Sequence, residues 1–200
     1  GVKQAITRCR GVLRKLRRIK GIAEPLVWVL KTDQGGEFEA VLIADFAGES
    51  GGLQEVVPKG RHVAKAEAIV RRVTEGIRTL LSSASLPTTY WPFAAEAWAH
   101  AMNLESADWR DLCSSEGFPC MKRVFGSLCW AKLPKDCDPN AQRGDEIARP
   151  VAFLGFAYLA QPSSRKSAHV LFLNAEGEYH ITTVQWEGLR FPDEVRFAFR

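Results

Sequence analysis

The chain has 200 residues, of which 46% are hydrophobic and 25% charged, and its formal net charge is +4. This length and composition are typical of one medium-sized soluble domain, alone or with a small appendage. No apolar run approaches the roughly 20 residues that a membrane-spanning helix needs, and no apolar segment follows the basic N-terminal region as in a signal peptide. We therefore expect an intracellular protein, nuclear or cytoplasmic, with no membrane partner. Because the chain starts at Gly1, we also expect a piece of a longer protein.

Positive charge is concentrated in the first segment. Residues 1–31 carry nine Lys and Arg residues against the single acid Glu24, a local charge of +8 that leaves −4 for the rest. Apolar residues recur at helical spacing over 3–20, which predicts an amphipathic helix that stops at Gly21. A basic helix of this kind is typical of a nucleic-acid contact surface, or of a solvated face. The residues of this helix that we expect to contact nucleic acid are Arg14, Arg17 and Arg18.

A short apolar run at 26–30 predicts a β-strand that is buried on both faces. It is followed by KTDQGGEF, residues 31–38, so Asp33 comes at the strand's carboxyl end. Open α/β sheets bind their ligands at that end. The alternative is an ordinary turn residue beside two glycines. Residues 47–62 contain four glycines and a proline, which predicts a mobile loop.

Two helices are predicted next. An apolar stripe at helical spacing covers 65–81, and after the break at Pro87 a second, very apolar helix covers 90–104. The first helix carries basic side chains that could follow DNA phosphates or face solvent, namely Lys65, Arg71, Arg72 and Arg78. The tryptophans that we assign to the hydrophobic core are Trp28, Trp91 and Trp98.

The later part of the chain changes character. Residues 105–122 are polar and predict a connecting loop, and four short strands follow at 124–133, 151–158, 169–173 and 179–186. We therefore divide the chain into 1–104, a loop at 105–122 and a small β-rich region at 123–200. The five cysteines and four histidines show no disulfide framework and no metal-ligand spacing, so we expect structural or incidental roles and a reducing compartment.

Two carboxylates suggest metal chemistry. Glu67 follows Asp33 by 34 positions and opens the helix predicted at 65–81. Mg²⁺ prefers carboxylate oxygens, and two such ions can hold the attacking and leaving oxygens of a phosphoryl transfer. The alternative for Glu67 is a favourable interaction with the positive end of the helix dipole. We expect Asp45, another acid after an apolar run, to be solvated.

Several blocks resemble the integrases of copia-type retrotransposons. KTDQGGEF resembles the motif around the second catalytic Asp of that family, and residues 64–103 resemble the segment that follows, with a catalytic Glu opening a helix. Further on, RVFGSLCWAKLP at 123–134 and VAFLGFAY at 151–158 are similar to the family's FG and FLGY segments. The order and spacing of these blocks carry the resemblance.

The resemblance implies an α/β fold whose first part is a partial ribonuclease-H-like core. In such cores two Asp and one Glu hold two Mg²⁺ or Mn²⁺ ions, and a DNA 3′-hydroxyl attacks the target DNA. By position, Asp33 is the second Asp and Glu67 is the Glu. The implied partners are the DNA ends of the element and target DNA. Assembly into a homo-oligomer is left as an open alternative. Glu37 lies within the motif but is no metal ligand in the family.

The chain departs from the family in one decisive respect. No Asp occurs before Asp33, so the first catalytic Asp is missing from these 200 residues, and Val-Ala at 63–64 replaces the usual Asn-Gly. We expect an integrase fragment that cannot carry out strand transfer alone, with Mg²⁺ or Mn²⁺ bound only if the site is completed. The alternatives are a non-catalytic nucleic-acid-binding remnant that uses the basic helices, or a protein-interaction scaffold.

Overall fold

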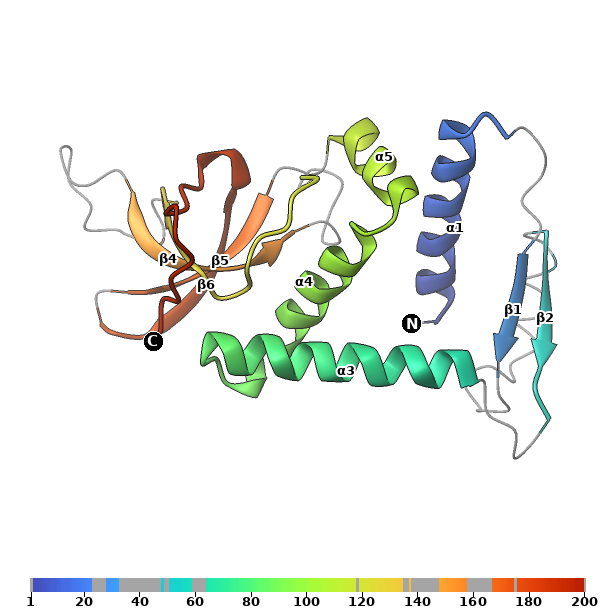
Figure 1. The fold of residues 1–200 in the computed structure, drawn as a ribbon, viewed down its shortest axis with the longest axis horizontal. Helices are drawn as coiled ribbons and strands as arrows, with labels where there is room; N and C mark the ends of the chain where they lie inside the picture. The colour runs from blue at the N-terminus through green and yellow to red at the C-terminus, as the bar shows by residue number, and fades with distance from the viewer. Residues whose placement is uncertain are drawn as a thin grey trace. The chain divides into compact units, whose positions relative to one another are not determined.

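The computed structural model shows a mixed α/β protein with helices and an antiparallel sheet (Figure 1). It describes residues 2–22, 28–32, 48, 51–58, 64–117, 119–134, 137, 148–157, 167–174 and 176–199. The chain forms two compact units, Gly1–Arg71 and Arg72–Arg200.

The first unit begins with helix α1, Val2–Ile19, which confirms the predicted amphipathic helix. The helix stops where expected, because Gly21 adopts a left-handed backbone with φ of +67°. In this turn the amide of Ile22 donates to the carbonyl of Arg17 at 3.0 Å, which satisfies one of the last helical carbonyls. Glycine favours this position because it has no Cβ to strain the backbone.

Strands β1, Trp28–Thr32, and β2, Gly52–Val56, pair in parallel (Figure 1). The predicted loop at 47–62 is therefore wrong for its central part, where backbone pairing with a distant strand outweighs the local glycines. Burial on both faces is also wrong, since Val29 is 52% exposed and its partner Leu53 is 66% exposed. These two strands form a sheet of their own.

Helices α3, Ala64–Ala84, and α4, Trp91–Asn103, confirm the two predicted helices, with a short 3-10 turn η1, Thr88–Tyr90, before α4. The side chain of Trp98 lies against Gly76 of α3, where any Cβ would overlap its indole ring. Trp91 is exposed, so its assignment to the core is wrong. The side chain of Trp28 lies outside the described residues.

Helix α5, Ala107–Glu116, occupies most of the segment predicted as a polar loop at 105–122. Its C-terminus has a left-handed Gly117 with φ of 71°. The helix buries Leu112 and Cys113 among otherwise polar residues. Arg110 ties it to the end of α4, because its Nη1 donates to the carbonyl of Leu104 at 2.7 Å. Few apolar positions therefore suffice to hold this helix in place.

The four predicted strands of the later region are confirmed. Strands β3, Leu128–Ala131, β4, Arg149–Phe156, β5, Ser167–Leu173, and β6, Tyr179–Gln185, form one antiparallel sheet in the order β3-β4-β5-β6. A 3-10 turn η4, Trp186–Gly188, follows β6. The chain then returns to β3, where Arg190 and Trp130 exchange backbone hydrogen bonds of 2.8 and 3.0 Å.

The sheet is buried on both faces by two hydrophobic clusters. One contains Leu81 and Ala84 of α3, Ala94 of α4, Phe125, and Ala152, Leu154 and Leu171 of the sheet. The other contains Phe153, Phe156, Val170, Val184 and Leu189. The end of α3 and all of α4 thus share a core with the later strands, which places them in one unit.

Strand β4 changes face at a bulge. Side chains alternate from Val151 to Leu154, and the register then shifts between Phe153 and Gly155. Phe156 consequently returns to the same cluster as Phe153, three positions earlier. Gly155, with φ of +128°, lies against Ala97 of α4, whose Cβ would be 3.5 Å from an added methyl group.

Gly126 has the tightest surroundings among the left-handed glycines of the described part. Its φ is +75°, and an added Cβ would overlap the Cβ of the fully buried Ala84 on α3. In the FG segment at 123–134, glycine is therefore favoured because a helix lies in close contact with it. The same holds for Gly155 in the FLGF segment. Among the described residues, no helix is long and apolar enough to cross a membrane.

Candidate functional site

The predicted site begins at the carboxyl ends of β1 and β2. Thr32, the last residue of β1, pairs with Val56, the last residue of β2. Its carbonyl accepts a hydrogen bond from the amide of Val57 at 2.8 Å, and its hydroxyl accepts one from Nε2 of Gln54 at 3.1 Å. Because the strands are parallel, the segments after both strands leave from the same edge of the pair.

Asp33 follows Thr32 directly and lies outside the described residues, as do Glu37 and Asp45. Its role as a metal ligand therefore stays a prediction. The structure fixes the residue before it: Thr32 is buried, at 4% exposure, and hydrogen-bonded through backbone and side chain. The strand that leads to Asp33 thus ends at a well-defined position.

Glu67 lies in the first turn of α3, as predicted, and its side chain is exposed. A carboxylate there suits both of its predicted roles. It favours the helix N-terminus through the dipole, and carboxylate oxygens are ligands that Mg²⁺ takes while it keeps several waters. Across the described residues, no three His, Cys, Asp or Glu side chains come together as a metal site, and Asp33 is outside that set.

The predicted basic residues of α3 are all exposed, namely Lys65, Arg71, Arg72 and Arg78. Two pairs are seven positions apart, so each pair falls on one side of the helix after two turns. On α1, Arg14 and Arg18 are exposed and four positions apart, whereas Arg17 is half-buried. The side chains are thus available to solvent, and their contact with nucleic acid stays a prediction.

Three titratable side chains of the second unit, those of His100, His169 and Glu96, are partly or fully buried. His100 of α4 is buried, its Nε2 lies 3.3 Å from the carbonyl oxygen of Met121, and its ring meets Phe156 edge-on at 5.3 Å. Burial lowers the pKa of His100 and also that of His169, and burial raises the pKa of Glu96. For His100 and His169 these environments fit the structural alternative of the prediction.

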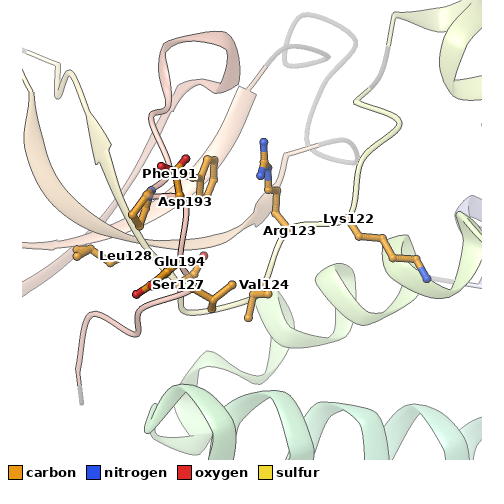
Figure 2. Close-up of a pocket in the computed structure, with 10 residues that line it drawn as sticks. Lys122, Arg123, Val124, Ser127, Leu128, Phe191, Asp193 and Glu194 are labelled. Atoms are coloured by element: carbon orange, nitrogen blue, oxygen red, sulfur yellow. The ribbon is translucent and has the colours of Figure 1, made fainter.

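A pocket that the sequence did not predict lies beside β3 (Figure 2). Its volume is about 150 Å³, and it is lined by residues 122–124, 127–128 and 191–195. The guanidinium carbon of Arg123 lies 4.5 Å from the ring centroid of Phe191. The hydroxyl of Ser127 is buried with no hydrogen-bond partner in the described part of the chain. The pocket forms because the C-terminal segment loops outward between its backbone pairings with Trp130 and Leu128.

Three curated proteins are similar to the chain. It is 30% identical over 136 residues to the retrovirus-related Pol polyprotein from transposon RE1 of Arabidopsis thaliana, which covers 63% of the chain. It is 29% identical over 165 residues, 73% of the chain, to that of transposon RE2 of the same plant. The counterpart from transposon TNT 1-94 of Nicotiana tabacum is 24% identical over 136 residues, 64% of the chain.

These relatives are polyproteins of retrotransposons, so the chain is similar to this class of protein. More narrowly, the chain is similar to the Pol polyproteins of plant copia-type retrotransposons, which confirms the resemblance at the level of the element. The matched region spans between 9% and 11% of the length of these relatives. The chain matches no family model.

Proposed function

We propose that the chain is the later part of a copia-type integrase, in which 1–104 contribute to a ribonuclease-H-like catalytic core. The similarity to retrotransposon Pol polyproteins supports this assignment at the level of the element. The observation that carries it further is the order of structural elements. A helix, a strand, a second strand parallel to the first and a helix with Glu67 in its first turn follow one another, and Asp33 comes directly after the first strand.

In this proposal Asp33 and Glu67 are two of three metal ligands. Both would offer carboxylate oxygens, the donors that Mg²⁺ and Mn²⁺ prefer in proteins. When bound, the ions would stabilise charge on the attacking and leaving oxygens of a phosphodiester. The basic side chains of α3 would bind the DNA backbone through phosphate contacts. Under this proposal the protein would act in the nucleus or the cytoplasm.

The incomplete set of carboxylates gives a direct prediction about activity. Positions 1–32 contain no Asp, and their only acid is Glu24. We therefore expect the purified 200-residue chain to show no joining of a DNA 3′-hydroxyl end to a target duplex in Mg²⁺ or Mn²⁺, measured with labelled oligonucleotides. Metal-dependent joining that Asp33→Asn abolishes would contradict the assignment of a missing ligand.

A second candidate function is nucleic-acid binding without chemistry. It is favoured by the exposure of Arg14 and Arg18 on α1 and of the four basic residues of α3. Phosphate contacts from such residues give affinity that carries no sequence information and falls with salt. Metal binding separates the two candidates, because only the integrase assignment requires Asp33 and Glu67 to act together.

A further inference from the structure

Two cysteines meet where α5 ends. Cys113, in the last turns of the helix, is fully buried, while Cys120 is exposed. The nearness of Cys120 is one of the causes that raise the pKa of Cys113, so the two thiols lie close enough to interact. The left-handed Gly117 ends the helix between them, and Cys120 is brought back to the helix that contains Cys113.

The position of Cys120 is fixed by further contacts with α5. Its Sγ lies 3.5 Å from the hydroxyl oxygen of Ser114 and donates to the carbonyl of Arg110 at 3.6 Å. Cys113 and Ser114 follow Arg110 by three and four positions, so both lie on the side of the helix that Arg110 faces. The Cys120 thiol therefore rests over the helix surface from which Cys113 reaches it.

From this contact we propose that Cys113 and Cys120 form an oxidation site, in which a peroxide oxidises the exposed Cys120 and the buried Cys113 then closes a disulfide. A disulfide requires its two sulfurs to approach to about 2.05 Å. The Sγ of Cys120 already contacts the carbonyl of Arg110 and the hydroxyl of Ser114, one turn from and next to Cys113, which brings the two thiols to the same part of α5. The disulfide would close a short loop that runs from Cys113 in α5 to Cys120.

The two steps balance with hydrogen peroxide as the oxidant. The Cys120 thiolate attacks one peroxide oxygen, an S–O bond forms, the O–O bond breaks, and the leaving hydroxide takes a proton to become water. The Cys113 sulfur then attacks the Cys120 sulfur, the S–O bond breaks, and the thiol proton of Cys113 leaves with the hydroxide as a second water. Two electrons pass from the two thiols to the peroxide.

The surroundings of the two thiols determine which of them reacts with peroxide first. Burial, together with the nearby Cys120, raises the pKa of Cys113 to about 12, so Cys113 stays a thiol at neutral pH. Peroxide in solution therefore meets Cys120 first. Cys129, which is buried in the sheet and whose pKa burial also raises to about 12, has no exposed position from which to start such a reaction.

Closing the disulfide would fasten the segment before β3 onto α5. Met121, which follows Cys120, has its carbonyl oxygen 3.3 Å from Nε2 of the buried His100 on α4. Arg110, whose carbonyl accepts from the Cys120 thiol, donates through its guanidinium to the carbonyl of Leu104 at the end of α4. The cross-link would thus connect two points that already contact α4, and we expect it to stabilise the second unit when it forms.

The test uses the native chain and equimolar hydrogen peroxide, followed by blocking of remaining thiols after unfolding, and mass spectrometry. Trypsin places both cysteines on one peptide, DLCSSEGFPCMK at 111–122, and further cleavage after Glu116 separates them. We expect this peptide to lose two hydrogens, to resist blocking, and to stay joined after the second cleavage until a reductant is added. Cys9 and Cys137 serve as internal controls that should remain blockable.

A matched variant removes the first thiol at an exposed position. In Cys120→Ser, Cys113 should remain blockable after peroxide, and the rise of a few degrees in Tm that peroxide gives the native chain should disappear. The proposal is overturned if Cys120 in the native chain is oxidised to a sulfinic acid or linked to another molecule while Cys113 remains blockable. It is equally overturned if neither cysteine reacts before Cys9 and Cys137.

Discussion

Replacing Gly126 with alanine is expected to lower the free energy of unfolding by about 2–5 kcal/mol, since left-handed strain and overpacking act together. The φ of Gly126 is +75°, and the new methyl group would overlap the Cβ of Ala84. Ala84 is fully buried between α3 and the sheet, so α3 cannot move away without opening the cluster that holds Phe125 and Leu154.

Gly177→Ala is the matched control for this prediction. Gly177 has a similar φ of +79° but nothing within 4 Å of an added Cβ, so only the backbone strain of about 1–2 kcal/mol applies. Urea unfolding followed by tryptophan fluorescence measures both variants. Equal losses in the two variants would show that the contact between Gly126 and α3 is absent from the folded protein.

The second large effect concerns DNA affinity. Changing Lys65, Arg71, Arg72 and Arg78 together to glutamine is expected to reduce the salt dependence of DNA binding strongly. If each side chain contacts one phosphate, the slope of log K against log salt becomes shallower by about 3–4, and affinity at low salt falls at least about tenfold. All four side chains are exposed along α3, so they are open to DNA. Fluorescence anisotropy with duplex DNA over a salt series measures both quantities.

Two exposed lysines that are already in ion pairs provide the control. Lys31 lies 2.9 Å from Glu55, and Lys122 lies 3.4 Å from Glu105. Changing both to glutamine should leave the slope close to that of the native chain, because a paired lysine releases few DNA counterions. Equal effects in the two variants would attribute binding to net charge alone. Binding that does not vary with salt in the native chain would favour the protein-interaction scaffold.

The elements that the sequence predicts correctly are those with strong local periodicity. The apolar residues of α1, α3 and α4 recur at helical spacing, and the strands of the later sheet are short apolar runs separated by breakers. Strand β2 escaped prediction because it is surrounded by glycines and is stabilised by pairing with a strand about twenty positions earlier. Helix α5 escaped because its burial involves only a few residues, although Ser106 and Gly117 bracket it as typical helix ends.

The candidate site was predictable only in its local parts. The position of Glu67 in the first turn of a helix follows from the spacing of the apolar residues after it. The pocket beside β3 depends on residues 191–195 returning to residues 122–128 from the end of the chain, which no local pattern reveals. The exposure of Trp91 was equally hidden, because helical spacing does not show which side of an apolar helix is covered.

Manganese binding tests the central claim that Asp33 and Glu67 are parts of one metal site. Electron paramagnetic resonance of free Mn²⁺ during titration counts the bound ion. A firmly held ion needs the completed site, but two carboxylates that lie together should keep a weak residual affinity, with a Kd of roughly 1 mM. We expect Asp33→Asn and Glu67→Gln each to abolish this binding, while Asp45→Asn, a change at an acid outside the proposed site, leaves it intact. Manganese binding that is absent from the native chain, or that survives both changes, would contradict the metal-site assignment.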